Sequence, residues 1–180
     1  DGNGRWAQKR GLPRSAGHKA GAETFRKLGT YCKNLGIGYL TVYAFSTENW
    51  KRPKDEVDGI MRLLEQYLHE CIDTMEKDGN RLRFLGDLSV LTPELRTLID
   101  ETNEISSRIE GFQANVCLNY GGRDEILHAA RAFARDCAAG KQDADALTEE
   151  GFSRYLYSSG LPDPDLLIRP GGEKRISNYL

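Results

Sequence analysis

The sequence predicts an α/β fold: a single domain over residues 1–180, with a central, mostly parallel sheet flanked by helices. Helical and strand-like segments alternate along the chain, as they do where helices connect parallel strands. The clearest segment, residues 54–78, has a regular i, i+3, i+4 apolar stripe. The chain is 39% hydrophobic and 29% charged, the composition of an ordinary globular domain.

The first half of the chain is predicted to contain two helices and a strand. Residues 17–35 place their apolar side chains on one helical face. Residues 39–45 read YLTVYAF, which is typical of a buried strand. A loop over 46–53 leads to the long helix of residues 54–78, which Gly79 can close.

The second half repeats the alternation. A short strand is predicted over 81–85, and a helix begins at Thr92-Pro93, with threonine as N-cap, and runs to about residue 109. A strand over 112–119 and a helix over 123–138 follow.

The end of the chain is predicted to hold a short helix over 148–157 and a last strand over 165–169. The chain opens on a glycine-rich segment with no strand before it, and it stops without a visible closing element. We therefore expect the sequence to be truncated at both ends, lacking the first strand and the C-terminal region of its domain.

The charges point to a small anionic ligand. The net charge of −2 argues against a general nucleic-acid binder. Residues 1–20 nevertheless carry five lysines and arginines against one acid; the alternative is a solvated basic face. The cysteines, at positions 32, 71, 117 and 137, form no C-x-x-C pair, so we interpret them as buried small hydrophobic residues.

Four segments combine glycines with arginines or hydrogen-bonding side chains. In open α/β sheets, ligands bind beyond the carboxyl ends of the strands. Three of the segments follow predicted strands, and the opening one would fit after a missing strand: 46–53, 119–123, 169–178 and 1–6. Glycines let backbone N–H groups approach an anion. The sequence contains no P-loop, dinucleotide fingerprint or nucleophile elbow.

Five arginines of these segments and their neighbourhood together suit two diphosphates, because a guanidinium matches phosphate oxygens bidentately. They are Arg5, Arg14, Arg52, Arg169 and Arg175. Any one of them alone is more typical of a surface residue or a structural ion pair.

Asp1 is the one carboxylate of the opening segment. A carboxylate beside phosphate-binding groups suits Mg²⁺, which takes a few protein oxygens together with phosphate oxygens and water. The alternative is an aspartate that starts a turn. Glu48 and Glu173 are further candidates, although either could equally pair with a neighbouring arginine.

These four segments, together with Gly17-His18, resemble in order the signature regions of the cis-prenyltransferase family, most closely those of bacterial undecaprenyl diphosphate synthases. The resemblance covers essentially the whole chain. It implies a Mg²⁺-dependent enzyme that condenses isopentenyl diphosphate with an allylic diphosphate, farnesyl diphosphate, and makes a long-chain polyprenyl diphosphate. The expected product is the undecaprenyl carrier lipid of cell-wall synthesis. The resemblance also implies a cytoplasmic homodimer that contacts the inner face of the membrane through its lipid product.

The resemblance assigns roles to matching residues. Asp1 is the catalytic aspartate that handles Mg²⁺, with a second ligand expected beyond residue 180. Residues that would hold the allylic diphosphate are Gly2, Asn3, Gly4, Arg5, Arg14 and His18. Residues that would complete substrate binding are Trp6, Ser46, Thr47, Glu48, Trp50 and Arg52. Residues that would hold isopentenyl diphosphate are Arg169, Arg175, Ile176 and Ser177.

Two of the implied roles have open alternatives. The family pattern treats Asn49 as the catalytic proton acceptor, but a neutral amide is a very weak base, so it would instead orient substrate or relay the proton to water or released diphosphate. The growing chain needs an apolar tunnel, for which Ile60, Leu63 and Leu64 are candidate lining residues; ordinary core packing is the alternative.

Two other functions compete with catalysis by this chain. One is a non-catalytic partner subunit of a prenyltransferase complex; such subunits typically lose the opening aspartate motif, which Asp1 and Arg5 retain here. The other is an unrelated phosphate-ester-binding α/β domain. Asn3 stands where an aspartate-nucleophile phosphatase would place its second aspartate, which argues against that alternative.

Overall fold

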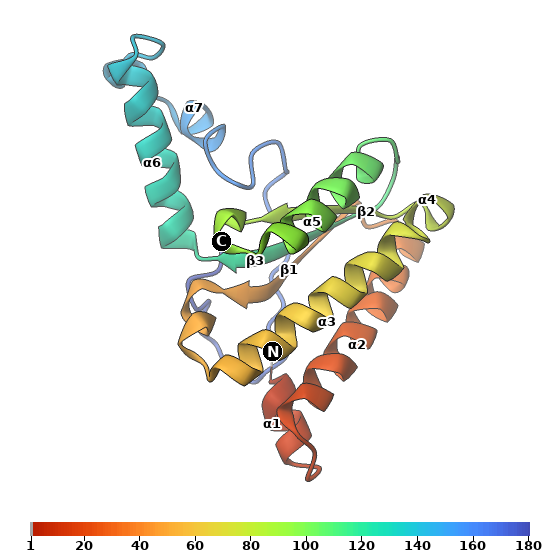
Figure 1. Cartoon of the computed structure of the whole chain (residues 1–180). Coiled ribbons are helices and arrows are strands. Elements are labelled where there is room, and N and C mark those ends of the chain that lie inside the picture. The colour runs from red at the N-terminus through yellow and green to blue at the C-terminus, as the bar shows by residue number, and fades with distance from the viewer. Residues whose placement is uncertain (1) are drawn as a thin grey trace.

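Three parallel strands in the order β1-β3-β2 form the sheet of residues 2–180, the part of the chain that this computed structural model describes (Figure 1). β1 spans Tyr39–Ser46, β2 spans Arg81–Leu85 and β3 spans Gln113–Tyr120. Tyr39 and Arg81 both pair with Gln113, so the strands start level with one another. Their carboxyl ends therefore lie along one edge, and the predicted α/β fold with a parallel sheet is confirmed.

Helices fill most of the remaining chain. They are α1 (Asn3–Gln8), α2 (Arg14–Asn34), α3 (Lys54–Ile72), α4 (Met75–Asp78), α5 (Pro93–Ser106), α6 (Gly122–Ala138) and α7 (Glu149–Ser153). Short 3₁₀ turns, η1 (Thr47–Lys51), η2 (Leu88–Val90) and η3 (Ala144–Ala146), lie in the connections. α5 begins as predicted, with the Thr92 hydroxyl accepting the Leu95 N–H at 3.3 Å.

Three helices differ from the expectation. α7, predicted over 148–157, spans only Glu149–Ser153. The helix predicted over 54–78 ends at Ile72, and α4 closes at Gly79 in a left-handed conformation. α1 was not predicted because its six residues, NGRWAQ, have too little apolar periodicity to signal a helix. Tertiary packing on α2 stabilises it instead.

The predicted strand over 165–169 is wrong. These residues form no strand, and their side chains Leu166 and Ile168 are 74% and 73% exposed. A short apolar run becomes a strand only where a neighbouring strand can take up its hydrogen bonds, and Pro164 and Pro170 flank this one.

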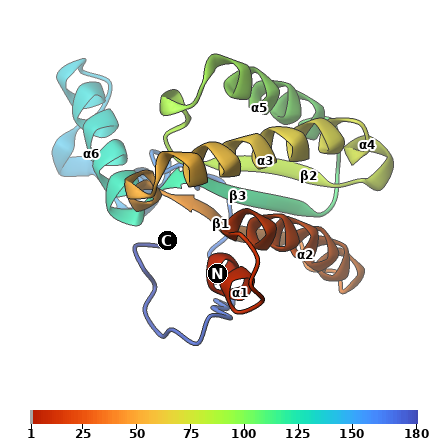
Figure 2. The same cartoon turned by 60° about the horizontal axis from the view of Figure 1, so that its bottom comes forward.

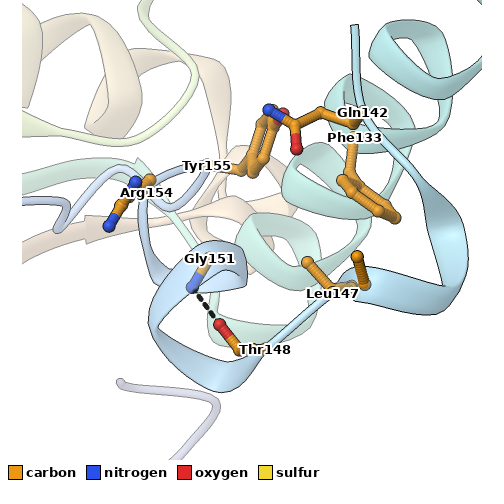
Figure 3. A pocket seen from close by; sticks show the side chains of 8 residues that line it. Phe133, Gln142, Leu147, Thr148, Gly151, Arg154 and Tyr155 are labelled. Atoms are coloured by element: carbon orange, nitrogen blue, oxygen red, sulfur yellow. Dashed lines mark hydrogen bonds between the residues drawn. The ribbon is translucent and has the colours of Figure 1, made fainter. Parts of the chain in front are cut away.

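α6 and α7 lie beside one another, with α6 extending away from the sheet (Figures 1 and 3). Phe133 of α6 packs edge-on against Tyr155, with 5.7 Å between ring centroids. A small cavity of about 130 Å³ lies between them, lined among others by Leu147 and Gly151 (Figure 3). The predicted site residues take no part in it.

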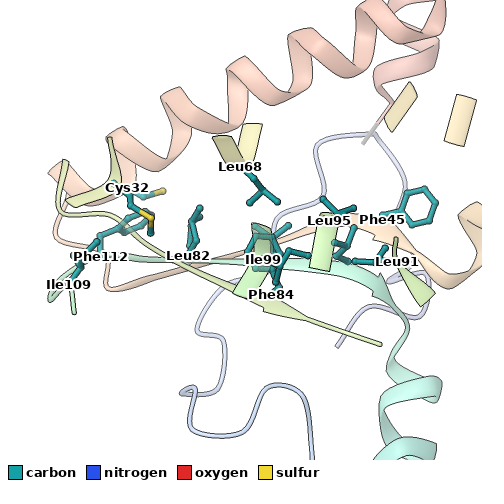
Figure 4. Packing of buried hydrophobic residues seen from close by; sticks show 14 of the residues in the cluster. Cys32, Phe45, Leu68, Leu82, Phe84, Leu91, Leu95, Ile99, Ile109 and Phe112 are labelled. Atoms are coloured by element: carbon teal, nitrogen blue, oxygen red, sulfur yellow. The ribbon is translucent and has the colours of Figure 1, made fainter. Parts of the chain in front are cut away.

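The two faces of the sheet are covered differently. One face carries Phe84, Val116 and Leu118 into the main core, where they meet α2, α3 and α5 (Figure 4). Figure 2 shows α3 and α5 over that face. On the other face, Leu85, Cys117 and Tyr120 pack against side chains of the C-terminal coil, Tyr157, Leu161 and Tyr179. The coil therefore lies across the sheet close to the strands' carboxyl ends.

The four cysteines form no disulfide within residues 2–180. Cys32 and Cys117 are buried as predicted, while Cys71 and Cys137 are partly buried. Among the described residues, no helix is both long enough and apolar enough to cross a membrane.

Candidate functional site

The segments singled out in the sequence lie mostly at the carboxyl edge of the sheet. β1 ends at Ser46 and passes directly into η1, which holds residues 47–50 of the predicted site. β3 ends at Tyr120 and passes through Gly121 into α6. Asp1 lies outside the described residues, so its predicted catalytic and metal-binding roles are not placed here.

Glycines allow α1 to pack closely on α2. A Cβ on Gly17 would lie 2.0 Å from the carbonyl oxygen of Asn3, and one on Gly21 would lie 2.4 Å from the Asn3 side-chain nitrogen. A Cβ on Gly4 would lie 2.8 Å from Nε of Arg14. Gly17 of the Gly17-His18 pair therefore serves close helix packing, which brings the opening glycine-rich segment beside Arg14.

A single carboxylate, that of Glu56 in the first turn of α3, contacts three of the predicted site residues. Its side chain is 8% exposed and contacts Arg14 Nε at 3.3 Å, His18 Nε2 at 3.4 Å and Arg52 Nη1 at 3.1 Å. The sequence reasoning missed Glu56; its i, i+4 spacing from Arg52 was the available signal. We call these four residues the Glu56 cluster.

His18 contributes little permanent charge to the Glu56 cluster. Burial lowers its pKa below the usual 6.5, because desolvation outweighs the attraction of the Glu56 carboxylate. The two arginines and one carboxylate then leave one excess positive charge, which favours an anion at this place.

The η1 turn fixes Asn49 and Trp50. The Asn49 side-chain oxygen accepts the backbone N–H of Ser46 at 3.1 Å, and the two residues form a capping box. The Trp50 indole N–H donates to the side-chain oxygen of Asn119 at 2.7 Å. Trp50 remains 40% exposed, so part of its ring is open to a ligand.

The C-terminal coil carries the second set of predicted cations. Arg169 donates to the Ser177 hydroxyl at 2.9 Å and to the carbonyl oxygen of Arg175. Arg175 pairs with Glu173 at 2.6 Å. Glu173 also lies 3.9 Å from Arg5, and this contact joins the coil to α1. Ile176, also predicted to bind substrate, is exposed.

Asn178 attaches this coil to the carboxyl edge of the sheet. Its side chain donates to Glu48 Oε1 at 3.2 Å and accepts the backbone N–H of Arg123 at 2.9 Å. Its carbonyl oxygen accepts the N–H of Gly122 at 2.7 Å. A Cβ on Gly121 would lie 2.6 Å from the Asn178 amide, so only glycine admits this contact. Asn178 was part of the matched motif but was not predicted as a site residue.

Glu48 and Glu173, the further candidates for binding a metal, interact with other side chains. Glu173 pairs with Arg5 and Arg175. The pKa of the Glu48 carboxyl is lowered, chiefly by a backbone N–H in η1 and to a smaller extent by the side chains of Ser46 and Asn178. Residues 2–180 contain no group of three or more His, Cys, Asp or Glu side chains that could hold a metal ion.

The candidate tunnel residues lie on α3. Ile60 and Leu64 are partly buried against the main core, and Leu63 is partly buried as well. A polar cavity of about 190 Å³, lined among others by Asp87 and His128, lies elsewhere, between α6 and the turn after β2. For Ile60 and Leu64, the contacts seen are those of core packing.

Comparison with known proteins gives consistent matches along the whole chain. Residues 1–180 match the family model described as "Putative undecaprenyl diphosphate synthase". The isoprenyl transferase of Clostridium perfringens is 47% identical over all of this chain and 71% of its own length. That of Heliobacterium mobile is 49% identical over all of this chain and 69% of its own length.

Two solved structures are similar in fold. Lavandulyl diphosphate synthase from Lavandula x intermedia, in complex with dimethylallyl diphosphate, superposes with a TM-score of 0.94 over 99% of this chain and 78% of its own, at 33% identity. A "probable undecaprenyl diphosphate synthase" from Campylobacter jejuni gives 0.75 over 87% of this chain and 72% of its own, at 39% identity.

Proposed function

Because the chain belongs to the undecaprenyl diphosphate synthase family of isoprenyl transferases, we propose that it lengthens an allylic diphosphate with isopentenyl diphosphate. The proposed primer is farnesyl diphosphate and the proposed product is the undecaprenyl carrier lipid for cell-wall synthesis. Because the family model covers residues 1–180, the alternative of an unrelated phosphate-ester-binding domain is excluded.

One observation carries this proposal: two groups of predicted diphosphate-binding cations, far apart in sequence, are joined by the contact of Arg5 with Glu173. The Glu56 cluster lies next to α1, because Gly4 of α1 packs against Arg14, a member of that cluster. A reaction between two diphosphates needs two such groups side by side, so that the reacting carbons are held together. The similar lavender enzyme, solved with dimethylallyl diphosphate, supports an allylic diphosphate as one ligand.

The allylic diphosphate is assigned to the N-terminal group. Arg5, Arg14 and His18, with the backbone of residues 2–4, would bind its oxygens, and Arg52 and Trp50 would complete the site. Glu56 keeps Arg14 and Arg52 in place before substrate arrives, which reduces the ordering needed on binding. Trp6, Ser46, Thr47 and Glu48 are proposed to contact the rest of the substrate.

Isopentenyl diphosphate is assigned to the C-terminal coil. Arg169, Arg175 and Ser177 are proposed to bind its diphosphate, with Ile176 beside them. Arginines suit this role because their planar forks match phosphate oxygens. Substrate would replace the pairing of Arg175 with Glu173.

In the proposed reaction, the allylic carbon–oxygen bond breaks and diphosphate leaves with the bonding electrons. Arg5, Arg14 and Arg52 stabilise the charge that develops on the leaving group. The double bond of isopentenyl diphosphate then forms the new carbon–carbon bond, and loss of a proton leaves a cis double bond. Asn49 is proposed to orient substrate or relay that proton, since its oxygen already accepts the Ser46 N–H and an amide is a weak base.

The proposed enzyme depends on Mg²⁺. Mg²⁺ takes one or two carboxylates together with substrate phosphates and does not need a cage of protein ligands, so a single carboxylate beside bound diphosphate suits this ion. Asp1 would hold it, with a second carboxylate beyond residue 180. When bound, Mg²⁺ would neutralise diphosphate charge.

The remaining parts of the proposal concern the product and the protein's surroundings. α3 is the proposed wall of the tunnel for the growing chain, through Ile60, Leu63 and Leu64. A homodimer in the cytoplasm, touching the inner face of the membrane through its lipid product, would deliver the carrier lipid where it is used.

The test uses the full-length protein with farnesyl diphosphate and labelled isopentenyl diphosphate, with and without Mg²⁺. Extracted products are sized. We expect a Mg²⁺-dependent series of long lipids that Asp1→Ala abolishes. A folded full-length protein that incorporates no label would refute the enzyme and favour the alternative, a non-catalytic partner subunit.

A further inference from the structure

Asn119 is an unusual residue at the carboxyl edge of the sheet. It is the second-to-last residue of β3, it is 5% exposed, and its φ is +46°. Few residues other than glycine tolerate this left-handed conformation, and asparagine is one of them. Backbone strain of this kind persists only where the surroundings hold it, and it gathers at functional sites.

The side chain of Asn119, within β3, bonds to the connections that follow the other two strands, β1 and β2. Its amide nitrogen donates to the carbonyl oxygen of Asp87, in the turn after β2, at 2.7 Å. Its oxygen accepts the indole N–H of Trp50, in η1 after β1, at 2.7 Å. The turn lies close, because a Cβ on Gly86 would be 2.1 Å from the carbonyl oxygen of Leu118. Both polar ends of this buried amide are therefore satisfied.

The Trp50 ring also contacts a side chain of β1. Its ring packs edge-on against Phe45, with 5.1 Å between centroids and 75° between planes. A ring contact of this kind is not specific for the N–H edge of the indole, whereas the hydrogen bond from that N–H to Asn119 fixes the direction of the edge.

We infer that Asn119 is a positioning residue that orients Trp50 for substrate, an inference that rests on the proposed role of Trp50 in substrate binding. Only an amide meets both requirements at this place. An aspartate keeps the acceptor for Trp50 but sets a carboxylate against the carbonyl of Asp87. A glycine keeps the left-handed backbone and removes both hydrogen bonds.

The experiment compares Asn119→Gly with the full-length wild-type protein. Indole nitrogens are labelled with ¹⁵N, which gives one N–H signal each for Trp6 and Trp50, and Trp50→Phe identifies the latter. In Asn119→Gly we expect the Trp50 N–H to exchange with water roughly tenfold faster, with the Trp6 signal unchanged. The KM for farnesyl diphosphate should rise roughly tenfold, with a smaller change in kcat.

The double variant Asn119→Gly/Trp50→Phe separates positioning from a general loss of structure. If Asn119 acts through Trp50, the KM of the double variant equals that of Trp50→Phe alone. Asn115→Ser, at a buried asparagine of the same strand that bonds Thr41 instead, is the matched control and should leave the Trp50 signal in place. Additive losses, or an unchanged Trp50 exchange rate in Asn119→Gly, would overturn the inference.

Failure of the proposed function looks different. If the wild-type protein transfers no prenyl group, KM cannot be compared between variants and Trp50 has no substrate to bind. The inference that Asn119 orients Trp50 for substrate is then refuted together with the proposed function. The exchange measurement would then still report whether Asn119 holds the indole.

Discussion

The Glu56 cluster and the C-terminal coil hold their arginines in opposite ways. In the Glu56 cluster, Arg14 comes from the first turn of α2 and Arg52 lies two residues before the start of α3, and both contact one carboxylate that is almost fully buried. In the coil, Arg169 and Arg175 lie in a segment without helix or strand, and the contacts of Arg169 with Ser177 and of Arg175 with Glu173 join residues of that same segment. The first group is held by the fold, and the second depends on a few anchors such as Asn178.

This difference shows which contacts hold the two groups of arginines in place at the carboxyl edge of the sheet. Helix packing and a shared buried carboxylate set the N-terminal cations in place without any ligand. The coil gains its position from Asn178 and from the packing of Tyr179 against Tyr43, whose rings stack with 4.7 Å between centroids. Loss of an anchor should therefore damage stability in the first group and local order in the second.

The largest effect is expected from Glu56→Ala. Removing the carboxylate leaves the guanidinium groups of Arg14 and Arg52 without a counter-charge and His18 without its hydrogen-bond partner, so the free energy of unfolding should fall by about 2–3 kcal/mol. Urea unfolding of the full-length protein measures this. Lys54→Ala is the matched control on the same helix end, since its exposed pair with Asp58 is worth less than about 0.5 kcal/mol. Equal losses in the two variants would contradict the central role of Glu56.

A smaller effect on stability but a local loss of order is expected from Asn178→Gly. Glycine keeps the left-handed backbone, φ +60°, and removes the side-chain bonds to Glu48 and Arg123. Trypsin should cut after Lys174 and Arg175 several-fold faster, while the free energy of unfolding changes by less than about 1 kcal/mol.

The same variant sharpens the assignment of the two substrates. The KM for isopentenyl diphosphate should rise roughly tenfold, with little change for farnesyl diphosphate. An equal rise for both substrates would show that the coil does not serve one of them specifically.

The smallest effect is a pH dependence that His18 adds to the Glu56 cluster. Because burial holds its pKa in the folded protein below 6.5, the unfolded chain takes up a proton first on acidification. The contribution of His18 is therefore complete above pH 6.5 and is lost as the pH falls below that value. Urea unfolding at pH 7.5 and 5.5 measures it, and His18→Gln should reduce the difference. An unchanged difference in that variant would assign the pH dependence to other groups.

Local patterns were sufficient for most of the regular structure. The strand predicted over 39–45 is β1, Tyr39–Ser46, and the predicted strand over 81–85 coincides with β2. Both are short apolar runs that a neighbouring strand covers. The run over 165–169, DLLIR, also has apolar residues at its centre but pairs with no strand, so it stays a coil with Leu166 exposed. Whether a segment forms a strand depends on whether another strand lies beside it, and the sequence of the segment alone does not reveal this.

The sequence by itself determined the α/β fold class, the family resemblance and the identities of the arginines and glycines at the site, because these follow from local periodicity and from motifs in order along the chain. Only the tertiary structure decided that Glu56 joins Arg14, His18 and Arg52, and that Asn119 meets Trp50. Asn119 lies 69 residues from Trp50, and His18 lies 38 residues from Glu56. A polar side chain far along the chain carries no local signal of its partner, because the contact exists only once the strands and helices have packed and excluded water from it.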